Sequence, residues 1–155
     1  MLVTPVSVAD KPMADATTIS KTVFFAAPRE TVWSFLTDKD KLATWFHPSD
    51  ANLEEGKPYT LHRIAEDGTK VPQIYGQVLE MDAPNRLVTT FCIAPFGEKS
   101  TTVTWVLEEA AGGTRLHLTH EGVADAAGEA TGRMLLSLDA GWDEHFASLR
   151  KSVAA

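Results

Sequence analysis

The sequence predicts an α+β domain in which a curved, six-stranded antiparallel sheet wraps around one long C-terminal helix. Residues 52–123 alternate apolar and polar side chains with a period of two, which is typical of strands. Residues 133–153 carry apolar side chains three and four positions apart, which is typical of an amphipathic helix. An antiparallel meander has one face to cover, and only this helix is long enough to cover it.

The N-terminal part of the domain is predicted to be a strand followed by two short helices. Residues 18–26 are rich in β-branched and aromatic side chains, which predicts a strand. Pro28 suits the first turn of a helix, so we expect residues 29–37 to be helical. Asp38 is placed to cap a second short helix at residues 39–45.

Five more strands complete the predicted sheet. They are expected at residues 57–64, 73–81, 86–93, 100–108 and 114–121. Asp67-Gly68 and Gly112-Gly113 have the residue types of tight hairpin turns, which favours antiparallel pairing of their neighbours. Residues 122–132 are small and acidic, so we expect a flexible crossing before the long helix.

Length, charge and cysteine content exclude several classes of protein. A chain of 155 residues fits one domain, here residues 17–155 after a loose tail of residues 1–16. The net charge of −7, without a basic run, disfavours nucleic acid. Cys92 is the only cysteine, so an internal disulfide is excluded and a buried thiol is expected. We predict no membrane insertion and a cytoplasmic location, because no long apolar stretch or secretory signal occurs.

A cavity is expected wherever the twisted sheet and the long helix do not quite touch. An apolar or amphipathic small molecule is the predicted partner there. The candidate ligand-binding residues are those expected at the inner faces and at the mouth: Trp45, Phe46, Tyr59, Leu61, Arg63, Val78, Phe91, Val103, Trp105, Leu118, His120, Met134, Leu138 and Trp142.

Several of these residues also have a purely structural interpretation. His120 shares a strand face with two leucines, so it either orients a polar group of a ligand or is a hydrogen-bonded core histidine. Trp142 either walls a pocket or packs in the core. Trp45 and Phe46 could gate the entry, serve a partner surface or close one end of the core.

The direction in which the Arg63 side chain points depends on whether its strand is regular. It shares a face with Tyr59 and Leu61, so it points inward unless a bulge intervenes. An inward arginine would mark an anionic head group or a buried carboxylate, with Glu80 as the best candidate. An arginine that reaches solvent at the strand end is the favoured interpretation.

No metal, cofactor or nucleophile motif is predicted. His117 and His120 are three apart on a strand, so they point to opposite faces and cannot share one metal. Gly-x-Ser-x-Gly is absent, and the glycines form neither a dinucleotide nor a phosphate-binding loop.

Six segments in the right order together resemble a known superfamily. These segments are residues 23–33, 45–48, 76–87, 102–108, 113–122 and 141–146. They resemble the START-like, birch-pollen-allergen-like (SRPBCC) superfamily, and in particular the branch named after the activator of the heat-shock protein 90 ATPase. The resemblance implies a helix-grip fold with a hydrophobic cavity. It does not imply one function, because members bind lipids or other apolar ligands and a few catalyse cyclisation or hydrolysis.

Three functional hypotheses follow. The first is a binding protein for an apolar metabolite. The second is a small enzyme of the cyclase or hydrolase kind, with His120 and either Arg63 or Glu80 as its polar groups, although nothing in the sequence demands catalysis. The third is an interaction module, either a chaperone partner or a regulator's companion, with an exposed apolar patch at Trp45 and Phe46. Pairing into a homodimer stays open.

Overall fold

The computed structural model describes residues 15–155, so the predicted tail of residues 1–16 lies almost wholly outside the described residues. The elements are β1 (Ile19–Phe25), α2 (Arg29–Thr37), α3 (Lys39–Trp45), β2 (Pro58–Ile64), β3 (Lys70–Asp82), β4 (Arg86–Phe91), η2 (Ala94–Phe96), β5 (Thr101–Ala110), β6 (Gly113–Glu121), α4 (Val123–Ala127), η3 (Gly128–Ala130) and α5 (Thr131–Ala154). This order confirms the predicted α+β fold. No helix between residues 15 and 155 combines the length and apolar character that crossing a membrane requires.

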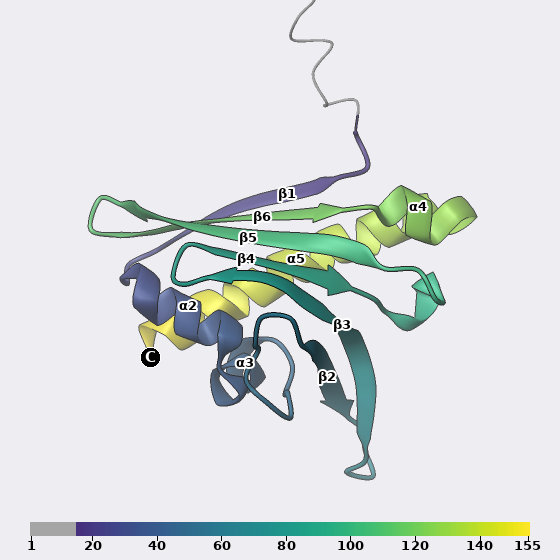
Figure 1. The fold of residues 1–155 in the computed structure, drawn as a ribbon, viewed down its shortest axis with the longest axis horizontal. Helices are drawn as coiled ribbons and strands as arrows, with labels where there is room; N and C mark the ends of the chain where they lie inside the picture. The colour runs from purple at the N-terminus through teal and green to yellow at the C-terminus, as the bar shows by residue number, and fades with distance from the viewer. Residues whose placement is uncertain (1–14) are drawn as a thin grey trace, which may run out of the picture.

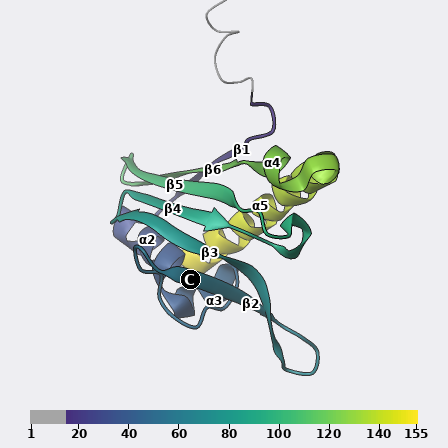
Figure 2. The same cartoon turned by 45° about the vertical axis from the view of Figure 1, so that its right-hand side comes forward.

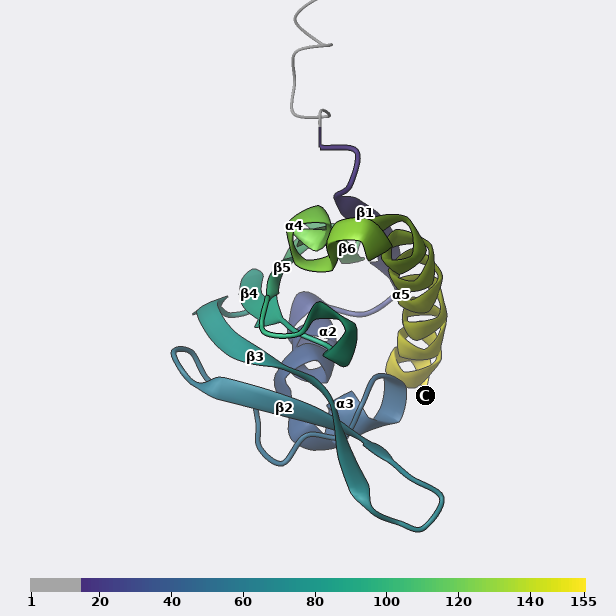
Figure 3. The ribbon, with the colours of Figure 1, turned by 90° about the vertical axis from the view of Figure 1, so that its right-hand side faces the viewer.

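The six strands form one antiparallel sheet in the order β1-β6-β5-β4-β3-β2. Figures 1 and 2 show α5 running along one face of this sheet, with α2 and α3 near its C-terminal end. In Figure 3 the strands curve from β1 round to β2, and α5 lies on the open side of the curve. The sheet therefore grips the helix as predicted.

Buried and less buried side chains alternate along the central strands β5 and β6, and the buried ones form much of the core. Alternate residues through the middle of β5 and β6 are buried: Val103, Trp105, Leu107, Leu116, Leu118 and His120. Trp142, Phe146 and Leu149 of α5 meet them at spacings of four and three, which places all three on one helix face. Each fully buried leucine side chain contributes about 1.5–3 kcal/mol, so this interface supplies much of the stability.

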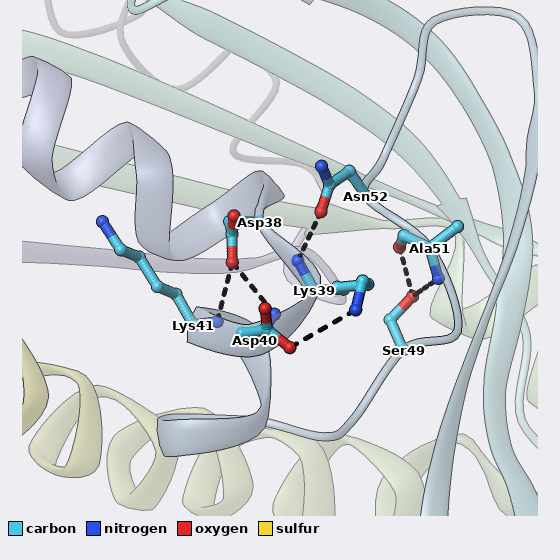
Figure 4. A network of polar contacts seen from close by, with 7 residues as sticks. All are labelled: Asp38, Lys39, Asp40, Lys41, Ser49, Ala51 and Asn52. Carbon is cyan, nitrogen blue, oxygen red and sulfur yellow. Dashed lines mark hydrogen bonds and ion pairs between the residues drawn. The ribbon is translucent and has the colours of Figure 1, made fainter.

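The connection between α3 and β2 is tied to the start of α3, as Figure 4 shows. The Asp38 side chain accepts hydrogen bonds from the backbone N–H groups of Asp40 and Lys41, at 2.9 and 3.1 Å, which confirms the predicted cap. Asn52 Oδ1 accepts from the Lys39 N–H at 2.8 Å. The connection between α3 and β2 is thus fixed to the start of α3 at Asn52, and it begins with Phe46 and His47 of the candidate site.

One local prediction is wrong. Residues 122–132 are not a flexible crossing, because they contain α4 and η3, and Val123 of α4 is fully buried. The pairing of β2 with β3 is irregular, as the sequence analysis of Arg63 allowed. The register shifts between Leu61 and His62, and Gln73 of β3 is skipped in the pairing. Leu61 and His62 are both buried, whereas Arg63 is exposed at the end of the strand, which is the interpretation the sequence favoured. Pro72 lies opposite His62 and has no N–H to donate, and the His62 N–H instead donates to the Pro48 carbonyl at 2.8 Å.

Candidate functional site

Aromatic rings occupy most of the space between the sheet and α5. Trp142 of α5 packs edge-on against Trp105 of β5, with ring centroids 5.4 Å apart, and stacks on Phe146 at 5.8 Å. Phe46 lies 5.6 Å from Trp142 and stacks on Trp45 at 4.9 Å. Trp45 is held in place because its indole N–H donates to the Phe35 carbonyl at 2.8 Å. The expected cavity is therefore mostly filled by side chains.

Two hollows remain around this aromatic cluster. The inner hollow has a volume of only about 30 Å³, which is room for about one water molecule. It is lined by Leu36, Leu42, Trp45, Phe46, Leu53, Tyr59, Leu61, Leu87, Thr89, Phe91, Val103, Trp105 and Trp142.

The outer hollow is larger, with a volume of about 200 Å³, and it opens to solvent between α5 and β3, two elements that face each other in Figure 3. It is lined by Phe46, His47, Gln73, Ile74, Phe91, Ile93, Met134, Ser137, Leu138, Gly141, Trp142 and His145. Phe46, Phe91 and Trp142 line both hollows and separate them.

The structure brings ten of the fourteen predicted site residues to these hollows. Eight line the inner hollow: Trp45, Phe46, Tyr59, Leu61, Phe91, Val103, Trp105 and Trp142. Met134 and Leu138 line the outer hollow, which three of those eight share. Val78 and Leu118 are buried in the core and reach neither hollow.

Arg63 does not point into the site. Its side chain is exposed at the end of β2, as is that of Ile64, which agrees with the favoured interpretation of the sequence. Glu80, the carboxylate expected to pair with it, instead accepts a hydrogen bond from Arg86 at 3.0 Å. The polar groups that the enzyme hypothesis requires therefore do not converge in one pocket.

His120 is a core histidine held by two hydrogen bonds. The Trp142 indole N–H donates to its Nδ1 at 3.1 Å, so Nδ1 is the unprotonated nitrogen and Nε2 carries the proton. Nε2 then donates to Thr101 Oγ1 at 2.8 Å, and that hydroxyl donates to the Phe91 carbonyl at 2.8 Å. Burial lowers the pKa of His120 to about 4, so the ring is neutral at pH 7. Its role in the structure is to orient Trp142, the shared wall of both hollows.

Sequence reasoning missed the two histidines at the rim of the outer hollow. His47 follows α3 and His145 lies on α5, and their ring centroids are 5.4 Å apart. Both rings also contact Phe46, at 4.9 and 4.7 Å. A signal was present, because His145 lies three residues after Trp142 and therefore on the same side of the helix.

Both rim histidines are neutral at pH 7. Burial, and secondarily the nearby His145, lower the pKa of His47 to about 4. Burial also lowers the pKa of His145, against the opposing influence of the Trp45 backbone and of Glu144. Among the described residues, none that lines the outer hollow carries a charge at neutral pH, and no three His, Cys, Asp or Glu side chains are placed to hold a metal ion.

The sheet, the two helices after β1 and the gripped C-terminal helix together define a START-like, helix-grip domain. The sequence profile described as Activator of Hsp90 ATPase homolog 1-like protein matches residues 26–154. The chain belongs to this family, as the resemblance predicted. A comparison with curated proteins found no match.

Solved structures share the fold over nearly the whole chain. CalU16 from Micromonospora echinospora is 25% identical with a TM-score of 0.70, over 88% of this chain and 75% of CalU16. A protein from Arthrobacter aurescens is 18% identical with a TM-score of 0.76. The match covers 90% of this chain and 87% of that protein. DynU16, a protein in the dynemicin biosynthetic locus, is 22% identical with a TM-score of 0.73, and this chain spans 48% of it. Family and relatives support a ligand-binding fold.

Proposed function

We propose that the protein binds a small apolar molecule of one or two rings in the outer hollow. The observation that carries this proposal is an opening of about 200 Å³ whose floor is made by Phe46, Phe91 and Trp142. Such a floor offers an apolar ligand flat surfaces to stack on, and burying its surface supplies about 25 cal/mol for each Å².

The volume limits the size of the ligand. An apolar cavity of about 150 Å³ is known to bind benzene, whereas sites for drug-sized ligands have volumes of about 300–1,000 Å³. The outer hollow, at about 200 Å³, therefore suits a fused pair of rings, and a longer ligand would extend through its opening into solvent.

The alternatives have less support. The interaction-module hypothesis requires an exposed apolar patch at Trp45 and Phe46, but Trp45 is only 4% exposed and Phe46 is half-buried. The enzyme hypothesis requires His120 to reach the ligand, but His120 is fully buried and lines neither hollow.

A titration with naphthalene tests the proposal. Chemical shifts of the tryptophan indole N–H and methionine methyl groups are followed by NMR in the native protein and in Gly141→Leu. Gly141 lines the outer hollow and a Cβ added there meets nothing within 4 Å, so the leucine side chain fits and fills the space.

Gly132→Leu is the matched control, because Gly132 lies on the same helix, has the same free space and does not line the hollow. We expect saturable binding to the native protein and to the control, and binding to Gly141→Leu that is at least about tenfold weaker. An absence of saturable binding to the native protein would refute the proposal, as would equal affinity in both variants.

A further inference from the structure

Two imidazole rings, packed edge-on against each other, lie among the residues that line the outer hollow. His47 and His145 are inclined to each other by 69° with their ring centroids 5.4 Å apart, and both rest against Phe46. They come from segments 98 positions apart in the chain, so the fold alone brings them together. The hydrogen-bonding groups of both rings therefore lie beside the aromatic floor.

The ring nitrogens of His47 are free to bind. Among the described residues His47 has no hydrogen-bond partner for its ring, and its nitrogens are not sealed from solvent, unlike Nδ1 of His62. His145 lies against the Trp45 backbone through one side of its ring and lines the hollow with the rest. A ligand that enters the hollow thus meets unused hydrogen-bonding groups on both rings.

The protonation state of this pair decides what it can recognise. A neutral imidazole has one N–H donor and one nitrogen acceptor. Two such rings can act together on one hydroxyl group, because one accepts its proton while the other donates to its oxygen. A carboxylate has only acceptors, and no residue lining the hollow supplies the positive charge that a buried anion needs.

We propose that the outer hollow selects uncharged, fused-ring aromatic ligands that carry a hydroxyl group, and that His47 and His145 hold this hydroxyl. This inference rests on the proposed function and adds the chemical class of the ligand. The aromatic floor binds the ring system, and the histidine pair supplies selectivity at its polar end.

Three probes of similar shape separate the two proposals. The affinity for naphthalene measures the contribution of the aromatic floor alone. 2-Naphthol adds a hydroxyl group to the same ring system, and 2-naphthoate carries a carboxylate in its place. At pH 7 we expect 2-naphthol to bind about tenfold more tightly than naphthalene, which corresponds to one or two net hydrogen bonds. We expect 2-naphthoate to bind at least about tenfold more weakly than 2-naphthol.

The variants His47→Phe and His145→Phe keep an aromatic ring but remove the hydrogen-bonding groups. In each we expect naphthalene to bind as before and the advantage of 2-naphthol to fall to within about twofold. His117→Phe is the control, because His117 lies on β6, bonds to Thr22 and does not line the hollow. The control should keep the full preference for 2-naphthol.

The outcomes distinguish the two proposals. If naphthalene binds in the outer hollow but 2-naphthol gains nothing, or if 2-naphthoate binds as well as 2-naphthol, the ligand class is refuted and the proposed function stands. If the histidine variants keep the preference, the assignment of the hydroxyl to this pair is refuted. If none of the three probes binds, both proposals fail.

Discussion

Acid is expected to destabilise this protein through one buried histidine. His120 is fully buried, and the indole N–H of Trp142 already occupies its Nδ1, so a second proton cannot enter without breaking that hydrogen bond. The perturbation is a pH titration of stability from 7.5 to 4, compared between the native protein and His120→Gln. Glutamine keeps a donor and an acceptor at this position but does not titrate.

The magnitude follows from the difference between the pKa values of the folded and unfolded states. Burial lowers the pKa of His120 from 6.5 to about 4, whereas the unfolded chain keeps the ordinary value. Below pH 6.5 the unfolded state therefore binds a proton that the folded state does not. The stability contribution is complete above pH 6.5, falls as the pH drops and is fully lost below about pH 4. At about 1.4 kcal/mol per pH unit, the loss is about 2 kcal/mol at pH 5 and about 3 kcal/mol in total.

The assay is urea unfolding followed by far-ultraviolet circular dichroism at half-unit pH steps. His47 and His145 also have lowered pKa values, so both proteins should lose stability in acid. The difference between them isolates His120, and the variant should lose about 3 kcal/mol less between pH 6.5 and 4. Identical pH dependence of the two proteins would refute the reasoning, as would an NMR titration in which the folded His120 protonates near pH 6.5.

Three further substitutions have expected effects on urea unfolding. Asp38→Ala removes two hydrogen bonds at the start of α3 and should cost about 1 kcal/mol; a cost near zero would mean that the cap is not needed. Gly76→Ala places a Cβ 2.3 Å from the Thr90 carbonyl oxygen, so we expect a loss of at least about 2 kcal/mol, and a neutral effect would contradict this close approach. Gly141→Ala should stabilise α5 by about 0.5–1 kcal/mol because the added Cβ meets nothing; a loss of stability would show that the backbone there needs glycine.

The sequence predicted the sheet well where local pattern decides the structure. β5 and β6 are each paired with a strand on both edges, and their buried and less buried residues alternate regularly. Trp105 and Leu118 are therefore buried in the core as expected. The buried face of α5 was equally predictable from the sequence. Trp142 and Phe146 are four residues apart, so they lie on one side of the helix, and both are buried.

The prediction failed where a distant partner decides the structure. Arg63 reaches solvent as favoured, but the burial of the adjacent Leu61 and His62 accompanies a register shift against β3, which alternation within β2 cannot reveal. The expected cavity is largely filled because ring packing across α3, β5 and α5 depends on side-chain geometry. The pairing of His47 with His145 is of the same kind, since no local pattern connects residues so far apart.

The most direct test of a ligand site beside α5 is an isotope-filtered nuclear Overhauser spectrum of the protein with naphthalene. Cross-peaks from the naphthalene protons to the methyl groups of Met134 and Leu138, and to the Trp142 ring, are expected because all three line the outer hollow. Cross-peaks only to exposed apolar residues on other parts of the surface, such as Phe24 and Leu79, would contradict the account.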